Sequence, residues 1–312
     1  MDGRLLLLAG SANRKLADEI AAFLKTKLSR AHVSTFSEGE IHVKILDDMR
    51  GADVFVIQPT SPPPNHNLME LLIIIDALKR ASADRITAVL PYFGYARQDR
   101  KDQPRVPITA KLVANLITVA GANRILTLDL HAGQIQGFFD IPLDHLYAVN
   151  VFVDYFKKKK IKNLVVVAPD VGGIKAARAY AKKLNASLAI VDKRRVDEQN
   201  AEAMNILGEV KGKNVLLVDD IVATAGSLCE AAHAVGENGA KRIYAACSHA
   251  ILSGPAIERL KKSSIEELCV TNSVDLPAAK KIDKVNVLTV APLLGEAIRR
   301  IHLSQSVSTL FD

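Results

Sequence analysis

The chain has 312 residues, of which 49% are hydrophobic and 24% are charged, so it can form two domains of ordinary size, each with a buried core. Trp is absent and aromatic residues make up only 5% of the chain, which argues against a surface that stacks nucleic-acid bases. The net charge of +7 favours anionic partners, and nucleotides or sugar phosphates meet that requirement as well as nucleic acid does.

Cysteine spacing and hydropathy exclude several further classes. Cys229, Cys247 and Cys269 are far apart and form no C-x-x-C pair, so neither a disulfide framework nor a zinc site is expected. No apolar run approaches the length of a membrane span or reads as a signal peptide. The basic run Lys157–Lys162 indicates a solvated helix end, with a nucleic-acid patch as the alternative. We expect a cytoplasmic protein with neither nucleic acid nor membrane as a partner.

The first half of the chain alternates short apolar runs with amphipathic segments. Strands are predicted at Arg4–Ala9, Val33–Phe36, Val54–Ile57, Arg85–Leu90 and Arg124–Leu128, and helices at Leu16–Leu28, Asn67–Ala81 and Ile108–Val119. Asn67 and Glu70 have the N-cap and N3 spacing of a variant capping box, so the second helix is expected to begin at Asn67.

The second half repeats this order about 160 residues later. The run Leu5–Ala9 resembles Val165–Pro169, and Asp53-Val54 resembles Asn214-Val215. Strands that alternate with helices imply mostly parallel sheets. We therefore predict an α/β fold of two similar domains, residues 1–147 and 148–312, each a mostly parallel sheet flanked by helices. The last helix is a candidate to pack back on the first domain.

The strongest functional signal is an apolar strand that leads into two carboxylates. Val215–Val218 precedes Asp219 and Asp220, and ligands of open α/β sheets lie beyond the carboxyl ends of strands. The loop that follows has the hydroxyls, glycine and helix start that suit a phosphate, and it consists of Ile221, Val222, Ala223, Thr224, Ala225, Gly226 and Ser227. This combination indicates a sugar phosphate. The alternatives are a polar strand end with an N-cap, and the acidic strand of an ATPase, although G-x-x-x-x-G-K-[S/T] is absent.

A second candidate segment directly follows the strand that ends at Leu90. Aromatic residues flank Gly94, and they are followed by Arg97, Gln98, Asp99, Arg100 and Lys101. A flat ligand could rest near the aromatics or Arg97, Gln98 could read its edge, and the cations could bind phosphates. This pattern suits ATP, and a solvated charged turn is the alternative.

Two more groups stand at strand ends. His131 and Asp170 follow strands of the two halves, and Mg²⁺ fills most of its coordination shell with water and phosphate oxygens. Because His is an unusual Mg²⁺ ligand, His131 alone would more often be a hydrogen-bonding residue. Lys193 and Arg195 close another strand, and a mobile cationic loop can offset charge in a transition state. The alternative for them is a solvated basic loop.

Taken together, these motifs resemble a known family. Val218–Ser227 looks like the phosphoribosyl-diphosphate loop of the type I phosphoribosyltransferase fold. Tyr92–Lys101, together with Asp129–Ala132 and Lys193–Arg195, is similar to the ribose-phosphate pyrophosphokinases. The resemblance implies transfer of the diphosphoryl group of ATP to the anomeric hydroxyl of ribose 5-phosphate, giving phosphoribosyl pyrophosphate and AMP for nucleotide biosynthesis.

The resemblance also implies a role for each motif. Ribose 5-phosphate is held by Asp170, Asp219, Asp220 and the loop from Ile221 to Ser227. ATP is contacted by Arg97, Gln98, Asp99, Arg100, Lys101 and His131, and by Phe36, Glu38 and Glu40 from a neighbouring subunit. Mg²⁺, as Mg-ATP and at a second site, is linked to His131 and Asp170. Lys193 and Arg195 are the catalytic cations that act on the transferring group.

Assembly and regulation are further implications. Family members are typically hexamers, built here from dimers, with phosphate activation and ADP inhibition, and Arg50, Ser82 and Arg105 are candidates for the effector site. Ala223 departs from the Asp that many members carry, so activity is expected but ribose 5-phosphate affinity or phosphate regulation is open to change. The competing interpretations are a phosphoribosyltransferase, an inactive regulatory homologue and a nucleic-acid regulator that senses phosphoribosyl pyrophosphate. A phosphoribosyltransferase has no need of the Tyr92–Lys101 segment.

Overall fold

The computed structural model describes residues 3–194 and 203–310, which form two compact units. The first unit comprises Met1–Tyr147, Ser273–Asp275 and Thr289–Asp312, and the second comprises Ala148–Asn272 and Leu276–Leu288. The chain therefore returns to the first unit for its last helix. None of the described helices is long and apolar enough to cross a membrane, and cytoplasmic location stays a prediction.

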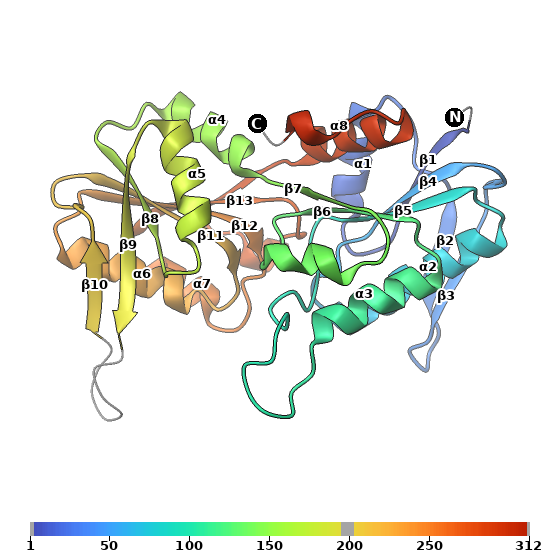
Figure 1. Ribbon diagram of the computed structural model, residues 1–312, viewed down its shortest axis with the longest axis horizontal. Coiled ribbons are helices and arrows are strands. Elements are labelled where there is room, and N and C mark those ends of the chain that lie inside the picture. The colour runs from blue at the N-terminus through green and yellow to red at the C-terminus, as the bar shows by residue number, and fades with distance from the viewer. Residues whose placement is uncertain (1–2, 195–202, 311–312) are drawn as a thin grey trace. The chain divides into compact units, whose positions relative to one another are not determined.

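The first unit is built on a five-stranded parallel sheet in the order β1-β4-β5-β6-β7. Its strands are β1 (Leu5–Ala9), β4 (Asp53–Ile57), β5 (Arg85–Leu90), β6 (Arg124–Leu128) and β7 (Leu143–Leu146). Its helices are α1 (Arg14–Phe23), α2 (Pro64–Arg80), α3 (Thr109–Ala120) and α8 (Ala291–His302), with short 3-10 turns η1 (Gly133–Phe138) and η3 (Ser308–Leu310). Helices α1 and α8 pack together on one face of the sheet, and α2 and α3 cover the other (Figure 1).

A separate antiparallel hairpin, β2 (Ala31–Thr35) and β3 (Ile41–Ile45), packs against α2. The sequence analysis predicted the first of these strands but missed β3, whose alternation of apolar residues with His42 and Lys44 extends over only five positions. The strand predicted at Val33–Phe36 thus belongs to a two-stranded sheet of its own.

The second unit contains a seven-stranded sheet in the order β10-β9-β8-β11-β12-β13-β14, in which β9 and β10 alone pair antiparallel among the described strands. The strands are β8 (Leu164–Ala168), β9 (Ser187–Arg194), β10 (Ala203–Leu207), β11 (Asn214–Val222), β12 (Arg242–Ala250), β13 (Ile265–Thr271) and β14 (Val285–Leu288). The helices are α4 (Val149–Lys159), α5 (Ile174–Leu184), α6 (Gly226–Glu237) and α7 (Ala256–Lys262), with a 3-10 turn η2 (Ala278–Lys280).

The two sheets repeat one strand order. Reading outward from β1 and from β8, the strands follow as β1-β4-β5-β6-β7 and as β8-β11-β12-β13-β14, each in chain order. The registers also correspond, because Leu5 pairs with Asp53, which pairs with Arg85, while Leu164 pairs with Asn214, which pairs with Arg242. The predicted fold of two similar, mostly parallel α/β domains is therefore confirmed.

The predicted capping box was wrong. Helix α2 begins at Pro64, with Pro63 at the N-cap, so Asn67 and Glu70 lie inside the helix rather than at its start. Both side chains are buried, and Asn67 Nδ2 donates to the carbonyl of Ser61 at 2.7 Å. Pro at the first helical turn has the φ that a helix requires, which explains why the helix starts three residues early.

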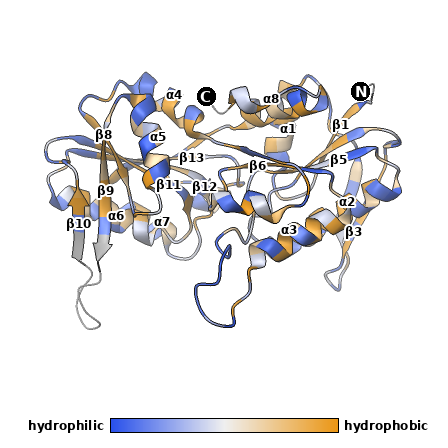
Figure 2. Ribbon diagram, in the orientation of Figure 1, coloured by the Kyte–Doolittle hydropathy of each residue, from blue (hydrophilic) through white to orange (hydrophobic). Residues whose placement is uncertain are grey.

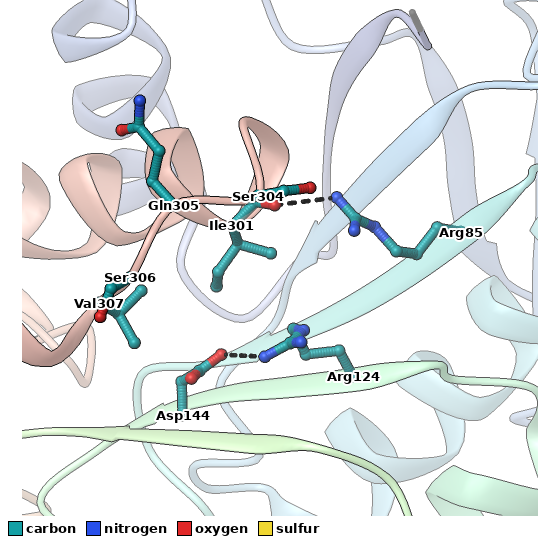
Figure 3. Close-up of a pocket in the computed structure, with 8 residues that line it drawn as sticks. All are labelled: Arg85, Arg124, Asp144, Ile301, Ser304, Gln305, Ser306 and Val307. Carbon is teal, nitrogen blue, oxygen red and sulfur yellow. Dashed lines mark hydrogen bonds and ion pairs between the residues drawn. The ribbon is translucent and has the colours of Figure 1, made fainter. Parts of the chain in front are cut away.

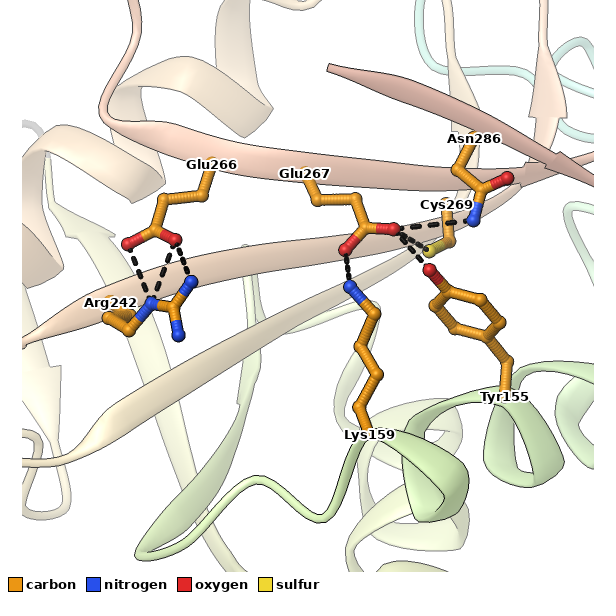
Figure 4. A network of polar contacts seen from close by, with 7 residues as sticks. All are labelled: Tyr155, Lys159, Arg242, Glu266, Glu267, Cys269 and Asn286. Atoms are coloured by element: carbon orange, nitrogen blue, oxygen red, sulfur yellow. Dashed lines mark hydrogen bonds and ion pairs between the residues drawn. The ribbon is translucent and has the colours of Figure 1, made fainter. Parts of the chain in front are cut away.

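A polar network fastens α4 to the sheet of the second unit (Figure 4). Glu267 of β13 pairs with Lys159 and accepts a hydrogen bond from the Tyr155 hydroxyl, both from α4. Asn286 Nδ2 of β14 donates to the same carboxylate at 3.3 Å. Burial raises the pKa of Glu267, but the hydrogen bonds from Lys159 and Tyr155 outweigh burial, so that pKa lies below its ordinary value.

Candidate active site

A cavity of about 330 Å³ in the first unit gathers most of the residues predicted to bind ATP. It is lined by Arg97, Gln98, Asp99, Arg100, Asp102, Val106, Pro107 and His131. His131 is thus brought beside the cationic segment from a different strand end. Lys101 is not among these lining residues, whereas Asp102 and Val106, which no sequence motif indicated, are. The loop that precedes α3 and lines this cavity is hydrophilic along most of its length (Figure 2).

The segment that leads into this cavity is fixed by a close approach of two backbones. Gly94 N donates to Thr60 Oγ1 at 2.6 Å, and a Cβ atom on Gly94 would lie 2.4 Å from the Thr60 carbonyl oxygen. Phe93 is buried and packs edge-on against Phe139, with ring centroids 5.8 Å apart. Of the aromatics proposed to receive a flat ligand, Phe93 therefore belongs to the core.

Hydrogen bonds hold two of the cavity residues at the start of α3. Thr109 Oγ1 donates to Gln98 Oε1 at 2.5 Å, and the Ala110 amide donates to the Gln98 carbonyl at 3.1 Å. Gln134 Nε2 donates to Asp99 Oδ2 at 2.8 Å. The exposed Gln98 side chain is thus oriented by the start of α3.

His131 follows a constrained turn after β6. Asp129 has φ 39°, in the left-handed region, and the Leu130 amide donates to His145 Nε2 at 2.8 Å. Because Nε2 accepts this bond, the buried His145 ring is not protonated there. The turn that presents His131 is therefore held by a histidine that the sequence did not single out.

The residues predicted to reach a neighbouring subunit lie on the β2–β3 turn. Phe36, Glu38 and Glu40 are exposed, and Phe36 N donates to the Glu40 carbonyl at 2.8 Å. In the part of the chain that the structure describes, they do not line the cavity that contains Arg97.

The paired carboxylates lie in the second unit, within a strand rather than after it. β11 continues through Asp219 and Asp220 to Val222, because β12 pairs with it along this whole length. Its pairing with β8 stops at Leu217. The carboxylates thus lie inside β11 but beyond the last residue that pairs with β8, so they have a strand beside them on only one side. The predicted strand end at Val218 was therefore four residues short.

Burial and the neighbouring negative charges dominate the electrostatics of Asp219. They raise the pKa of Asp219 from 3.8 to about 8: burial has the largest effect, followed by the charge of Asp220, and the charge of Asp170 adds to both. Asp170 also accepts a hydrogen bond from the Gly173 amide at 3.0 Å, at the start of α5. The three carboxylates therefore act on one another, and a cation or hydroxyl donor would relieve them.

The loop after β11 exposes hydroxyls and helix amides. Thr224 and Ser227 are exposed, and α6 begins at Gly226 without a side-chain cap on its first amides. The left-handed residue is Ala225, with φ 58°, and not Gly226. A loop of this kind, at a helix N-terminus, can receive a phosphate.

The equivalent corner of the first unit is filled by protein. Glu70 accepts hydrogen bonds from Ser11 N and Ser11 Oγ, both at 2.6 Å, and from Gln58 Nε2 at 2.9 Å. Gln58 Oε1 in turn accepts from the Ala12 amide at 3.1 Å. These groups lie at the ends of β1 and β4, which correspond to β8 and β11. The donors that could bind a ligand there are already used.

A larger cavity of about 460 Å³ lies between β5, β6 and the segment after α8 (Figure 3). Its two arginines are already paired: Arg85 with Asp53, and Arg124 Nη1 with Asp144 Oδ2 at 2.7 Å. Arg85 Nη2 also donates to the Ile301 carbonyl at 3.1 Å. This cavity therefore reflects how the C-terminal segment is anchored.

The remaining predicted residues are spread over other loops. The backbone of Lys193 pairs with Met204 in β9 and β10, whereas its side chain and all of Arg195 lie outside the described residues. Arg50 and Ser82 are neighbours, since the Gly51 amide donates to the Ser82 carbonyl at 2.9 Å. Arg105 lies on the loop before α3.

Comparison with known proteins agrees with this arrangement. A family model for the N-terminal domain of ribose phosphate pyrophosphokinase matches residues 5–121, and one for the phosphoribosyl synthetase-associated domain matches residues 197–312. The ribose-phosphate pyrophosphokinase of Bacillus caldolyticus is 58% identical over 309 residues, which cover 99% of this chain and 98% of that protein. The protein of the same name from Corynebacterium ammoniagenes is 54% identical over 312 residues, with 100% and 98% covered.

A solved structure extends the likeness to three dimensions. The phosphoribosylpyrophosphate synthetase of Mycobacterium smegmatis aligns with a TM-score of 0.92 and 41% sequence identity, over 96% of this chain and 99% of that one. Sequence and fold therefore agree along nearly the full length, and the chain belongs to the ribose-phosphate pyrophosphokinase family.

Proposed function

We propose that the two candidate sites divide the substrates of this family's reaction, with ATP in the cavity of the first unit and ribose 5-phosphate at the acidic loop of the second. The chain makes phosphoribosyl pyrophosphate by transfer of the diphosphoryl group of ATP to the anomeric hydroxyl of ribose 5-phosphate, and AMP leaves. The observation that carries the assignment is the pair of carboxylates in β11 directly before a loop whose helix, α6, begins without a side-chain cap. Two crowded carboxylates are acceptors for the neighbouring hydroxyls of a ribose.

On the nucleotide side, Arg97 and Arg100 are exposed cations that bind phosphates, and Gln98 is oriented to meet the base or ribose. Phosphoryl-type transfer depends on positioning and charge neutralisation rather than on a covalent intermediate. Lys193 and Arg195 supply that neutralisation on the transferring group. Their chemistry requires no general base from the protein.

The carboxylates of Asp170, Asp219 and Asp220 are oxygen donors of the kind that Mg²⁺ prefers. Within the described residues, no group of three or more His, Cys, Asp and Glu converges on one metal position, so phosphate oxygens would complete the coordination. Bound Mg²⁺ would neutralise the charge on those oxygens. His131 lies in the ATP cavity, where it donates to or accepts from the nucleotide or its hydrated metal.

The exposed β2–β3 turn and an exposed apolar face of α3 both support self-association. Ile108, Leu112, Leu116 and Val119 are exposed at spacings of four, four and three residues, which place them on one side of the helix. A contiguous apolar face is typical of a protein contact. We propose a dimer-based hexamer in which Phe36, Glu38 and Glu40 complete the ATP site of a neighbour. Phosphate is the proposed activator, at Arg50, Ser82 and Arg105.

The test is a product assay with purified protein, Mg-ATP and ribose 5-phosphate. AMP is expected in a one-to-one ratio with phosphoribosyl pyrophosphate. Release of ADP, or no turnover when phosphate is present, would contradict the proposal. Lys193→Ala and Arg195→Ala should each lower kcat far more than they raise either KM. Sedimentation of the parent and of Leu112→Glu tests the assembly, since a monomeric parent would rule it out.

A further inference from the structure

The loop that follows β11 is backed by the segment from the end of β12 to α7. Three consecutive carbonyls of the loop accept hydrogen bonds from this segment. The amides of Ile251 and Leu252 both donate to the Val222 carbonyl, at 3.0 and 3.1 Å, and Ser253 N donates to the Ala223 carbonyl at 2.8 Å. The third carbonyl, that of Thr224, accepts from Arg259 Nη1 at 3.1 Å.

This pattern fixes the direction of the loop amides. In a trans peptide the carbonyl and the following N–H point in opposite directions. Since the carbonyls of residues 222, 223 and 224 point toward the backing segment, the amides of residues 223, 224 and 225 point away from it. Two of the three carbonyls are held by backbone donors, and the last one depends on the Arg259 side chain.

The backbone after Thr224 adopts an unfavourable conformation. Ala225 has φ 58°, a left-handed value that costs a non-glycine residue about 1–2 kcal/mol. The guanidinium of Arg259 lies close to the next residue, because a Cβ atom on Gly226 would be 3.1 Å from Nη1. Arg259 is therefore in contact with the loop on both sides of its strained residue.

Charge gives Arg259 a second effect. The stretch Asp219–Ser227 holds two carboxylates and no cation, so a bound phosphate would add to an excess of negative charge. The field of Arg259 reaches the first turn of α6. There, burial raises the pKa of the Cys229 thiol, whereas a hydrogen bond with Ser263 and the positive charge of Arg259 both act to lower it.

We propose that Arg259 is a positioning residue for ribose 5-phosphate, which holds the Thr224 carbonyl so that the loop amides face the phosphate and which adds a positive charge beside a loop that has no cation of its own. The inference rests on the proposed assignment of this loop to ribose 5-phosphate. It adds a residue from a different helix, 35 positions away along the chain, to the substrate site.

The experiment compares Arg259→Ala and Arg259→Lys with Lys262→Ala, which removes an exposed cation from the same helix. Steady-state kinetics give kcat and the KM for each substrate, and thermal unfolding reports the fold. Arg259→Ala should raise the KM for ribose 5-phosphate about ten- to hundredfold, as expected for a lost charged hydrogen bond. The KM for ATP and the melting temperature should stay near the parent values. Arg259→Lys should recover part of the affinity, and Lys262→Ala should match the parent.

A double-mutant cycle with Ser227→Ala separates this inference from the site assignment. If both residues act through one loop, their effects on the KM for ribose 5-phosphate will not add. A large effect of Ser227→Ala beside less than a twofold effect of Arg259→Ala would overturn the inference and leave the assignment standing. If neither variant changes this KM, the assignment itself fails. Equal rises in the KM for ATP and the KM for ribose 5-phosphate, or strictly additive effects in the cycle, would show that Arg259 has only a structural role.

Discussion

Asp219 should make the ligand-free enzyme less stable as the pH rises, and Asp219→Asn should remove that effect. The carboxyl has an ordinary pKa of 3.8, and in the folded chain burial and the charge of Asp220 raise it to about 8. The substitution keeps the side-chain shape. It also keeps the acceptor for the Asp220 amide, which donates to Asp219 Oδ1 at 2.9 Å. The removable charge is thus the main difference between parent and variant.

The sign follows from the raised pKa. Below about pH 4 the carboxyl is protonated in both the folded and the unfolded chain, and it has no effect on stability. Above that pH the unfolded chain ionises first, so the free energy of unfolding falls until the pH passes about 8. Over the roughly three pH units up to neutrality, at about 1.4 kcal/mol per unit, the largest possible loss is about 4 kcal/mol. Partial exposure of the site to solvent reduces it to about 2–4 kcal/mol.

The assay is thermal unfolding of the ligand-free parent, of Asp219→Asn, and of Asp283→Asn, an exposed carboxylate of the same unit. At neutral pH, Asp219→Asn should unfold about 5–10 °C above the parent, and the gap should close near pH 4. The variant should also lose affinity for ribose 5-phosphate, which is the usual exchange of activity for stability. A gap of the same size at both pH values, or an equal gain in Asp283→Asn, would refute the reasoning.

Three further predictions concern residues outside the loop. Glu70→Ala should lower the unfolding free energy by about 1.5–3 kcal/mol, because it removes a buried carboxylate that accepts hydrogen bonds from Ser11 and Gln58; an unchanged urea midpoint would contradict this. Gly94→Ala should cost about 1–3 kcal/mol and raise the KM for ATP, since its Cβ would clash with the Thr60 carbonyl; parent-like kinetics would count against the tight approach. Glu267→Gln should cost about 1 kcal/mol at neutral pH. Because the pKa of Glu267 is lowered, its contribution disappears as the pH falls through that value, and acid unfolding curves should converge.

Most of the fold could be predicted because its signals are local. Each parallel strand is a short run of apolar residues buried on both faces, such as Val165–Val167, and the runs recur in the same order in both halves. The hairpin strand β3 was missed although its apolar residues alternate with His42 and Lys44, because a run of five residues is a short signal.

The candidate site was predicted less completely, because its geometry depends on contacts far apart in the chain. The segment from Arg97 to Arg100 was found from its composition, but its wall also includes His131 and Asp102. The strand through Asp219 was placed too short because its extra length comes from pairing with β12. Arg259 carries no sequence signal, since its role depends on one carbonyl contact.

The two repeats differ in how the carboxylates at one corner of the sheet are surrounded, which favours the second unit as the ligand site proposed above. At the ends of β1 and β4, the carboxylate is that of Glu70 in the following helix, α2. It accepts hydrogen bonds from Ser11 and Gln58. At the ends of β8 and β11, the carboxylates come from the strand and from the loop after β8. Burial and, after it, the charge of Asp220 raise the pKa of Asp219 there. A buried carboxylate that accepts hydrogen bonds from the protein stabilises the fold. Carboxylates that lie close together destabilise it until a ligand supplies hydrogen-bond donors. The same corner of one repeated unit thus holds a carboxylate with internal hydrogen-bond donors in the first copy, and three carboxyl groups, among them Asp219 with its raised pKa, in the second.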